Sequence, residues 1–224
     1  MTPLTKAQAK PLLKDHVNNG SANHTRISGN RITGYVYTRE TLNSSIGSNG
    51  IYLLWCLEGE GEDAKLCTLV TDLTENEIAN SDVLHLPQLI TTKTITFCEN
   101  ILGEPIPPTV LINRHGDYFQ NISNTEFFNS KNEKIKGYHL DNNDIIDLGL
   151  NATVTDENKN DQFILIPMIR EKDLQITTFN NPFISLAVAK IEEILDEQIQ
   201  VCGPAREYCD PCPSACYNHS DLIK

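Results

Sequence analysis

The chain lacks long hydrophobic runs and is poor in positive charge. No apolar stretch approaches the roughly 18 residues of a transmembrane helix, so we expect no membrane span. The 18 lysines and arginines stand against 30 aspartates and glutamates, and the net charge of −12 disfavours binding to nucleic acids or anionic membranes. The polar N-terminus has no apolar segment of a secretory signal, which favours a cytoplasmic protein.

Complete catalytic motifs are also missing. We find no nucleotide-binding glycine loop, no serine-hydrolase elbow and no metalloprotease helix. Many short β-forming runs are present instead, and unpaired strand edges promote association between chains. We therefore expect a non-catalytic structural or protein-interaction protein that self-assembles, with a homo-oligomer or another protein as its partner.

The N-terminal region contains the clearest local signals. Thr5 and Gln8 have the spacing of a capping box, which predicts an amphipathic helix over residues 5–18. Residues 34–38 are predicted to form a short strand, and Thr38 is placed to cap a helical turn that follows it.

A β-hairpin is predicted directly afterwards. The apolar run 51–57 and the β-forming run 65–71 flank a polar, glycine-rich turn. This hairpin places Cys56 near Cys67, and we interpret the two as a packed pair of thiols.

The rest of the chain mixes predicted strands with one predicted helix. Strands are expected over residues 93–98, 109–113 and 163–169, and Pro167 suggests an edge or a bulge in the last of these. Asn181 and Pro182 have the residue types of a helix start. A long helix is then predicted from apolar residues at helical spacing: Ile184, Val188, Ile191, Leu195 and Ile199.

The expected fold class is therefore α+β, with a mostly antiparallel sheet, an N-terminal helix and a long C-terminal helix followed by a cysteine-rich tail. We divide the chain into residues 1–80 (helix and hairpin), 81–200 (an α+β unit ending in the long helix) and 201–224 (the tail).

The tail concentrates residues that bind metals. Four of the seven cysteines lie close together near the C-terminus, followed by His219: Cys202, Cys209, Cys212 and Cys216. Four thiolates complete a tetrahedral zinc site, so a structural zinc site on these cysteines is one hypothesis. Disulfides, within or between chains, are an equal alternative, and unligated thiols in a docked tail are a third.

One short motif resembles a known enzyme family. Arg114-His115-Gly116 lies in a predicted loop after the predicted strand 109–113 and resembles the signature of histidine phosphatases. The resemblance implies a histidine that becomes phosphorylated and arginines that hold the phosphate. A phosphatase-like enzyme using His115 is thus an alternative function, and Asp117 and His139 are the other polar residues that we consider for such a site.

The chain also resembles short bacterial proteins of uncharacterised function. The shared features are the N-terminal amphipathic helix, the central hairpin and an ending rich in cysteine and proline, here Cys212-Pro-Ser-Ala-Cys216. This resemblance implies no activity and no role for any residue.

Overall fold

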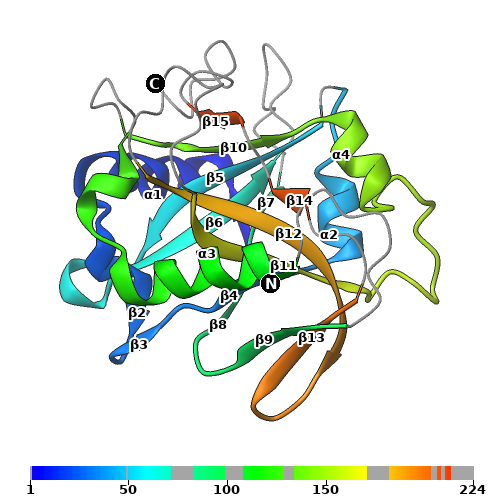
Figure 1. The fold of residues 1–224 in the computed structure, drawn as a ribbon. Coiled ribbons are helices and arrows are strands. Elements are labelled where there is room, and N and C mark those ends of the chain that lie inside the picture. The colour runs from blue at the N-terminus through cyan, green and yellow to red at the C-terminus, as the bar shows by residue number, and fades with distance from the viewer. Residues whose placement is uncertain are drawn as a thin grey trace.

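Two β-sheets packed face to face form the centre of the molecule (Figure 1). The computed structural model describes residues 2–48, 50–71, 83–98, 108–128, 134–170, 182–202, 206–207 and 210–212. Within these residues the chain is mostly sheet and has four α-helices. The predicted α+β class is therefore confirmed.

The first sheet has the order β1-β7-β6-β5-β10-β15, with bounds Thr2–Thr5, Val83–Leu86, Lys65–Thr71, Ile51–Glu58, Gly137–Leu140 and Asp210–Cys212. The second sheet has the order β8-β4-β11-β12-β13-β9, with bounds Gln88–Ile90, Gly34–Thr38, Gln162–Arg170, Phe183–Ile194, Gln198–Val201 and Thr94–Phe97. β14 (Arg206–Glu207) pairs with β12, and β2 (Arg26–Ile27) pairs with β3 (Asn30–Arg31). Among the described strands, β13 and β9 form the parallel pair and the other pairings are antiparallel.

Helices cover the outer face of each sheet (Figure 1). α1 (Lys6–Asn19) packs Ala9 and Leu13 on the first sheet, and α3 (Pro108–Asn121) packs Leu111 on the second. The described part also contains α2 (Arg39–Ser44), α4 (Asn142–Asp147) and the 3-10 turns η1 (Ala22–Thr25), η2 (Gly61–Asp63) and η3 (Asn124–Phe127). None of the described helices has the length and apolar character needed to cross a membrane.

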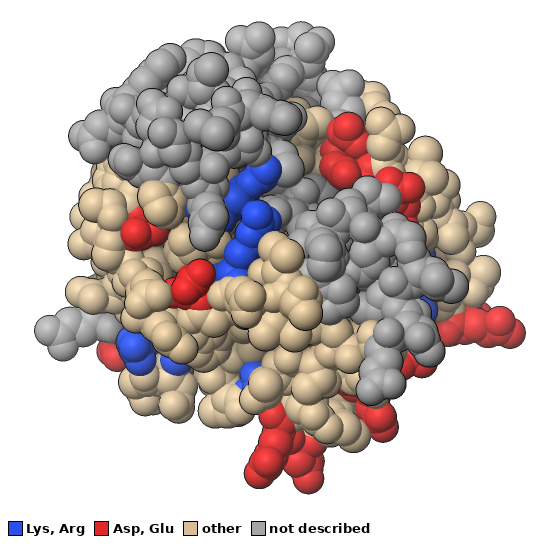
Figure 2. Space-filling view, viewed as in Figure 1, with Lys and Arg blue, Asp and Glu red and all other residues tan. Residues whose placement is uncertain are grey.

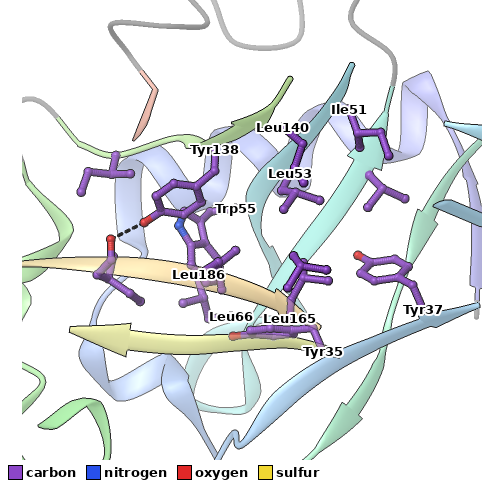
Figure 3. Packing of buried hydrophobic residues seen from close by; sticks show 14 of the residues in the cluster. Tyr35, Tyr37, Ile51, Leu53, Trp55, Leu66, Tyr138, Leu140, Leu165 and Leu186 are labelled. Atoms are coloured by element: carbon purple, nitrogen blue, oxygen red, sulfur yellow. Dashed lines mark hydrogen bonds between the residues drawn. The ribbon is translucent and has the colours of Figure 1, made fainter. Parts of the chain in front are cut away.

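The main core lies between the sheets (Figure 3). Trp55 and Tyr138 of the first sheet point toward Tyr35 and Leu186 of the second, and Trp55 meets the edge of Tyr35 at 5.7 Å between ring centroids. The Tyr138 hydroxyl donates to the Ile184 carbonyl and so links β10 to β12. Aromatic rings fill much of this layer, and each contributes a large buried apolar area.

β12 corrects the sequence prediction, because residues 183–194 form a strand rather than a long helix. Ile184, Leu186 and Val188 face the core between the sheets, whereas Ala187 and Ala189 face the layer under α3. A strand buried on both faces is apolar at nearly every position, so helix-spaced apolar residues occur in it as well. The predicted cap residue Asn181 lies outside the described residues.

α3 is the second correction, because the predicted strand 109–113 and its following loop are one helix. Pro108 occupies the first helical position, where a missing N–H costs nothing. Leu111, Tyr118 and Ile122 are buried at the spacing of successive helical turns. The Arg114-His115-Gly116 motif therefore lies inside a helix.

Several local predictions are confirmed. Thr5 caps α1 through the predicted capping box with Gln8, and Thr38 caps α2. β5 and β6 form the predicted hairpin, in which Cys56 lies directly opposite Cys67 and both remain buried free thiols. β9 and β11 match the strands expected over 93–98 and 163–169.

The two largest predicted sequence units share sheets and core. β7 and β10, from beyond residue 80, pair with β6 and β5 in the first sheet. β4, from before residue 80, pairs with β11 in the second sheet. The segments on either side of residue 80 therefore bury one common core.

Candidate functional site

A cavity of about 330 Å³ lies between α3 and one end of the second sheet. Its floor and walls are mainly apolar, and threonines line part of it. Described residues from four places in the chain line it: Thr33, Thr91, Thr92, Lys93, Thr94, Ile95, Phe97, Ile112, His115, Gly116, Phe119 and Ile166. Cavities of this size and composition are typical of sites for small molecules.

His115 is a polar side chain at this cavity that the fold holds through a hydrogen bond and ring contacts. Its Nδ1 lies 2.6 Å from the carbonyl oxygen of Pro167, and its ring meets the edge of Phe119 at 4.8 Å between centroids. β4 pairs only with residues 162–165 of β11, so the backbone at Pro167 has no strand partner on that side. The carbonyl oxygen of Pro167 is thus free to accept the hydrogen bond from His115 of α3.

Burial lowers the pKa of His115, and the hydrogen bond to Pro167 opposes this effect in part. The imidazole is therefore neutral at pH 7. A carbonyl oxygen only accepts hydrogen bonds, so Nδ1 carries the proton and Nε2 carries a lone pair.

Lys93 is the cationic side chain among the described lining residues. Its ammonium donates to the carbonyl oxygens of Leu195 and Asp196, the latter at 2.7 Å. These bonds tie the segment between β8 and β9 to the turn between β12 and β13. Two of the three ammonium protons are thereby used within the protein.

A disulfide between Cys98 and Cys202 braces the β9 wall of the cavity. The two Cα atoms are 5.1 Å apart, and the bond closes a loop of sequence separation 104. Phe97, the residue before Cys98, lines the cavity. β9 and β13 are a parallel pair held in register from Thr94 to Phe97, and the disulfide follows directly after it.

Cys202 is therefore paired with Cys98, which lies outside the cluster of tail cysteines. A sulfur in a disulfide is not a thiolate ligand, so Cys202 is not available to a metal while this bond is intact. Only the backbone of Cys212 is described, in β15, and Cys209 and Cys216 lie outside the described residues. Zinc binding by the tail stays a prediction, and the described residues contain no cluster of three potential metal-binding side chains.

The other residues considered for catalysis do not gather around His115. His139 lies on β10 and stacks on Tyr52, in the layer that α1 covers on the first sheet, with ring centroids 4.5 Å apart. Asp117 is exposed on α3 and accepts a hydrogen bond from Asn121. Both sheets separate His115 from His139, so the fold does not assemble a site from the two histidines.

Sequence reasoning identified His115 but missed its surroundings. Lys93, Phe97 and Ile166 come from separate strands and loops, and no spacing in the sequence connects them to α3. The one local signal is the run Thr91-Thr92-Lys93-Thr94, whose polar residues next to a short strand fit a loop at the edge of a site.

Comparison with known proteins gives no match: no family model, no curated protein and no solved structure matches the chain.

Proposed function

We propose that this protein is a non-catalytic binding protein whose cavity between α3, β9 and β11 takes a small, largely apolar molecule. The observation that carries the proposal is the cavity of about 330 Å³ with apolar walls and a firmly held neutral histidine. This proposal keeps the non-catalytic class predicted from the sequence and adds a ligand.

The chemistry of the lining supports binding over catalysis. A nucleophile or general acid–base pair needs a second reactive group within hydrogen-bond reach of the histidine. The described lining residues include neither a carboxylate nor a thiol, and neither Lys93 nor a lining threonine is hydrogen-bonded to His115. The Nδ1 proton of His115 is held by a backbone carbonyl, which orients the ring but does not activate a nucleophile.

Gly116 offers a direct test because it lies in the wall of the cavity. A Cβ atom added at this helical glycine meets no heavy atom within 4 Å. We therefore expect Gly116→Trp to place an indole ring in the cavity without a clash at Cβ. Gly116→Ala is the matched control, since it leaves the cavity open and stabilises the helix by about 1 kcal/mol.

Benzofuran, a neutral bicyclic compound of fitting size, is the probe. We expect its titration into ¹⁵N-labelled protein to shift amide signals of α3 and β9 with a single saturating site. The same shifts should persist in Gly116→Ala and disappear in folded Gly116→Trp. Equal binding by wild-type protein and Gly116→Trp, or no binding by wild-type protein, contradicts the proposal.

A further inference from the structure

We infer that the cavity selects neutral ligands that donate one hydrogen bond, and that Nε2 of His115 is the acceptor that recognises this donor. The inference rests on the proposed binding function and names the chemical class of its ligand: a compact apolar molecule with one N–H or O–H group.

The hydrogen bond to Pro167 decides which role His115 plays. Nδ1 must donate to the carbonyl at 2.6 Å, so the neutral ring has its lone pair on Nε2. Nε2 has no hydrogen-bond partner among the described residues. It is also not fully buried, so a ligand can reach it. It is therefore the polar atom that His115 offers to a molecule in the cavity.

The packing of the ring keeps this arrangement fixed. His115 contacts Phe119 edge to face and stacks on Tyr118, whose side chain is fully buried. A ring packed against two aromatic neighbours and hydrogen-bonded through Nδ1 does not rotate freely to exchange its two nitrogens. A preorganised acceptor of this kind favours a matching donor because little ordering is needed on binding.

The charges near the cavity favour a neutral ligand. Lys93 repels cations, and most of its protons already serve the turn between β12 and β13. That hairpin carries four exposed acidic residues: Glu192, Glu193, Asp196 and Glu197. Figure 2 shows acidic side chains at the bottom of the molecule, where Figure 1 places the hairpin of β12 and β13. These carboxylates disfavour an anion, and the apolar walls of Ile95, Phe97 and Ile166 disfavour any ion.

Indole and benzofuran form a matched pair for the test. The two molecules have nearly the same size and shape, but indole has an N–H donor where benzofuran has a ring oxygen. We expect indole to bind wild-type protein about fivefold more tightly, as follows from one added hydrogen bond of ordinary strength. 1-Methylindole, in which the donor is blocked, should bind like benzofuran.

Substitutions then assign the acceptor. In His115→Phe the preference for indole over benzofuran should fall to about one, while benzofuran binding reports that the cavity is intact. His139→Phe, the same substitution at a histidine on the other sheet and away from the cavity, should keep the full preference. If His115→Phe loses the cavity altogether, the comparison of indole with 1-methylindole on wild-type protein still tests the donor.

The outcomes separate the two proposals. If benzofuran and indole bind wild-type protein equally, the donor inference is wrong and the binding function stands. If the preference survives in His115→Phe, another residue is the acceptor and the inference is also wrong. If none of the three compounds binds wild-type protein, the proposed function itself fails.

Discussion

Acid should destabilise this protein through one buried histidine, His16 of α1. Its side chain is fully buried, with Nε2 at 3.0 Å from the Ile135 carbonyl and Nδ1 without a partner. Burial lowers the pKa of His16 from 6.5 to about 3, and the hydrogen bond to Ile135 opposes this effect only in part. Nδ1 has little space, because a Cβ atom at Gly20 would lie 2.4 Å from it.

The sign follows from proton binding. Between the two pKa values the unfolded chain binds a proton at His16 and the folded chain does not, so the free energy of unfolding falls as pH falls. The contribution is complete above the unfolded pKa of 6.5 and decreases steadily toward pH 3. Each pH unit in this window is worth about 1.4 kcal/mol. At about pH 4.5 the loss from His16 alone is therefore about 2.7 kcal/mol.

The assay is urea unfolding of wild-type protein and His16→Gln at about pH 7.5 and pH 4.5. Glutamine keeps an amide donor for the Ile135 carbonyl but does not titrate, so carboxylates and other histidines cancel in the comparison. We expect wild-type protein to lose about 2.7 kcal/mol more than the variant between the two pH values. Equal losses in the two proteins, or a proton on His16 near pH 6 in an NMR titration of the folded state, would refute the reasoning.

Five further predictions test other parts of the molecule. Replacing Cys98 and Cys202 together by serine should lower the free energy of unfolding by about 4.7 kcal/mol, which is the loop-closure entropy of a cross-link that spans about 100 residues. Reductant should then have little effect on the stability of this variant. Calorimetry with and without reductant checks this, and free thiols at both positions in oxidised wild-type protein would contradict it. Gly50→Ala should cost more than about 3 kcal/mol, because φ is 108° and the added Cβ lies 1.9 Å from the Leu140 oxygen. Gly29→Ala, at φ 84° in open space, should cost only about 1–2 kcal/mol in the same urea experiment. If the tail cysteines hold zinc, a chelator should release about one zinc ion per chain, and the freed thiols should then react in a thiol titration. Purified protein that contains almost no zinc would contradict the zinc hypothesis. Self-assembly predicts an oligomer by light scattering at micromolar concentration, and a strict monomer contradicts it.

Much of the candidate site depended on contacts that no local pattern encodes. His115 attracted attention through its neighbours Arg114 and Gly116, in a segment that we predicted to be a loop after a strand. The helix places the same histidine against Pro167, 52 residues away, and that contact sets its tautomer. Cys202 was grouped with the nearby tail cysteines, although its partner in the fold is Cys98, and the two cysteines directly follow the parallel strands β13 and β9.

The sequence by itself determined those elements whose signals are local. The capping box of Thr5 and Gln8, the cap at Thr38 and the hairpin around the turn at Gly59 each depend on residues a few positions apart, and the structure has them where they were predicted.

Tertiary structure decided β12 and α3. Residues 183–194 carry a pattern compatible with a helix or a doubly buried strand, and burial between two layers selects the strand. Residues 108–121 carry β-branched side chains early in the segment, and packing of Leu111 and Tyr118 selects the helix. Apolar burial depends on which surfaces meet, and those surfaces come from parts of the chain that are far apart in sequence.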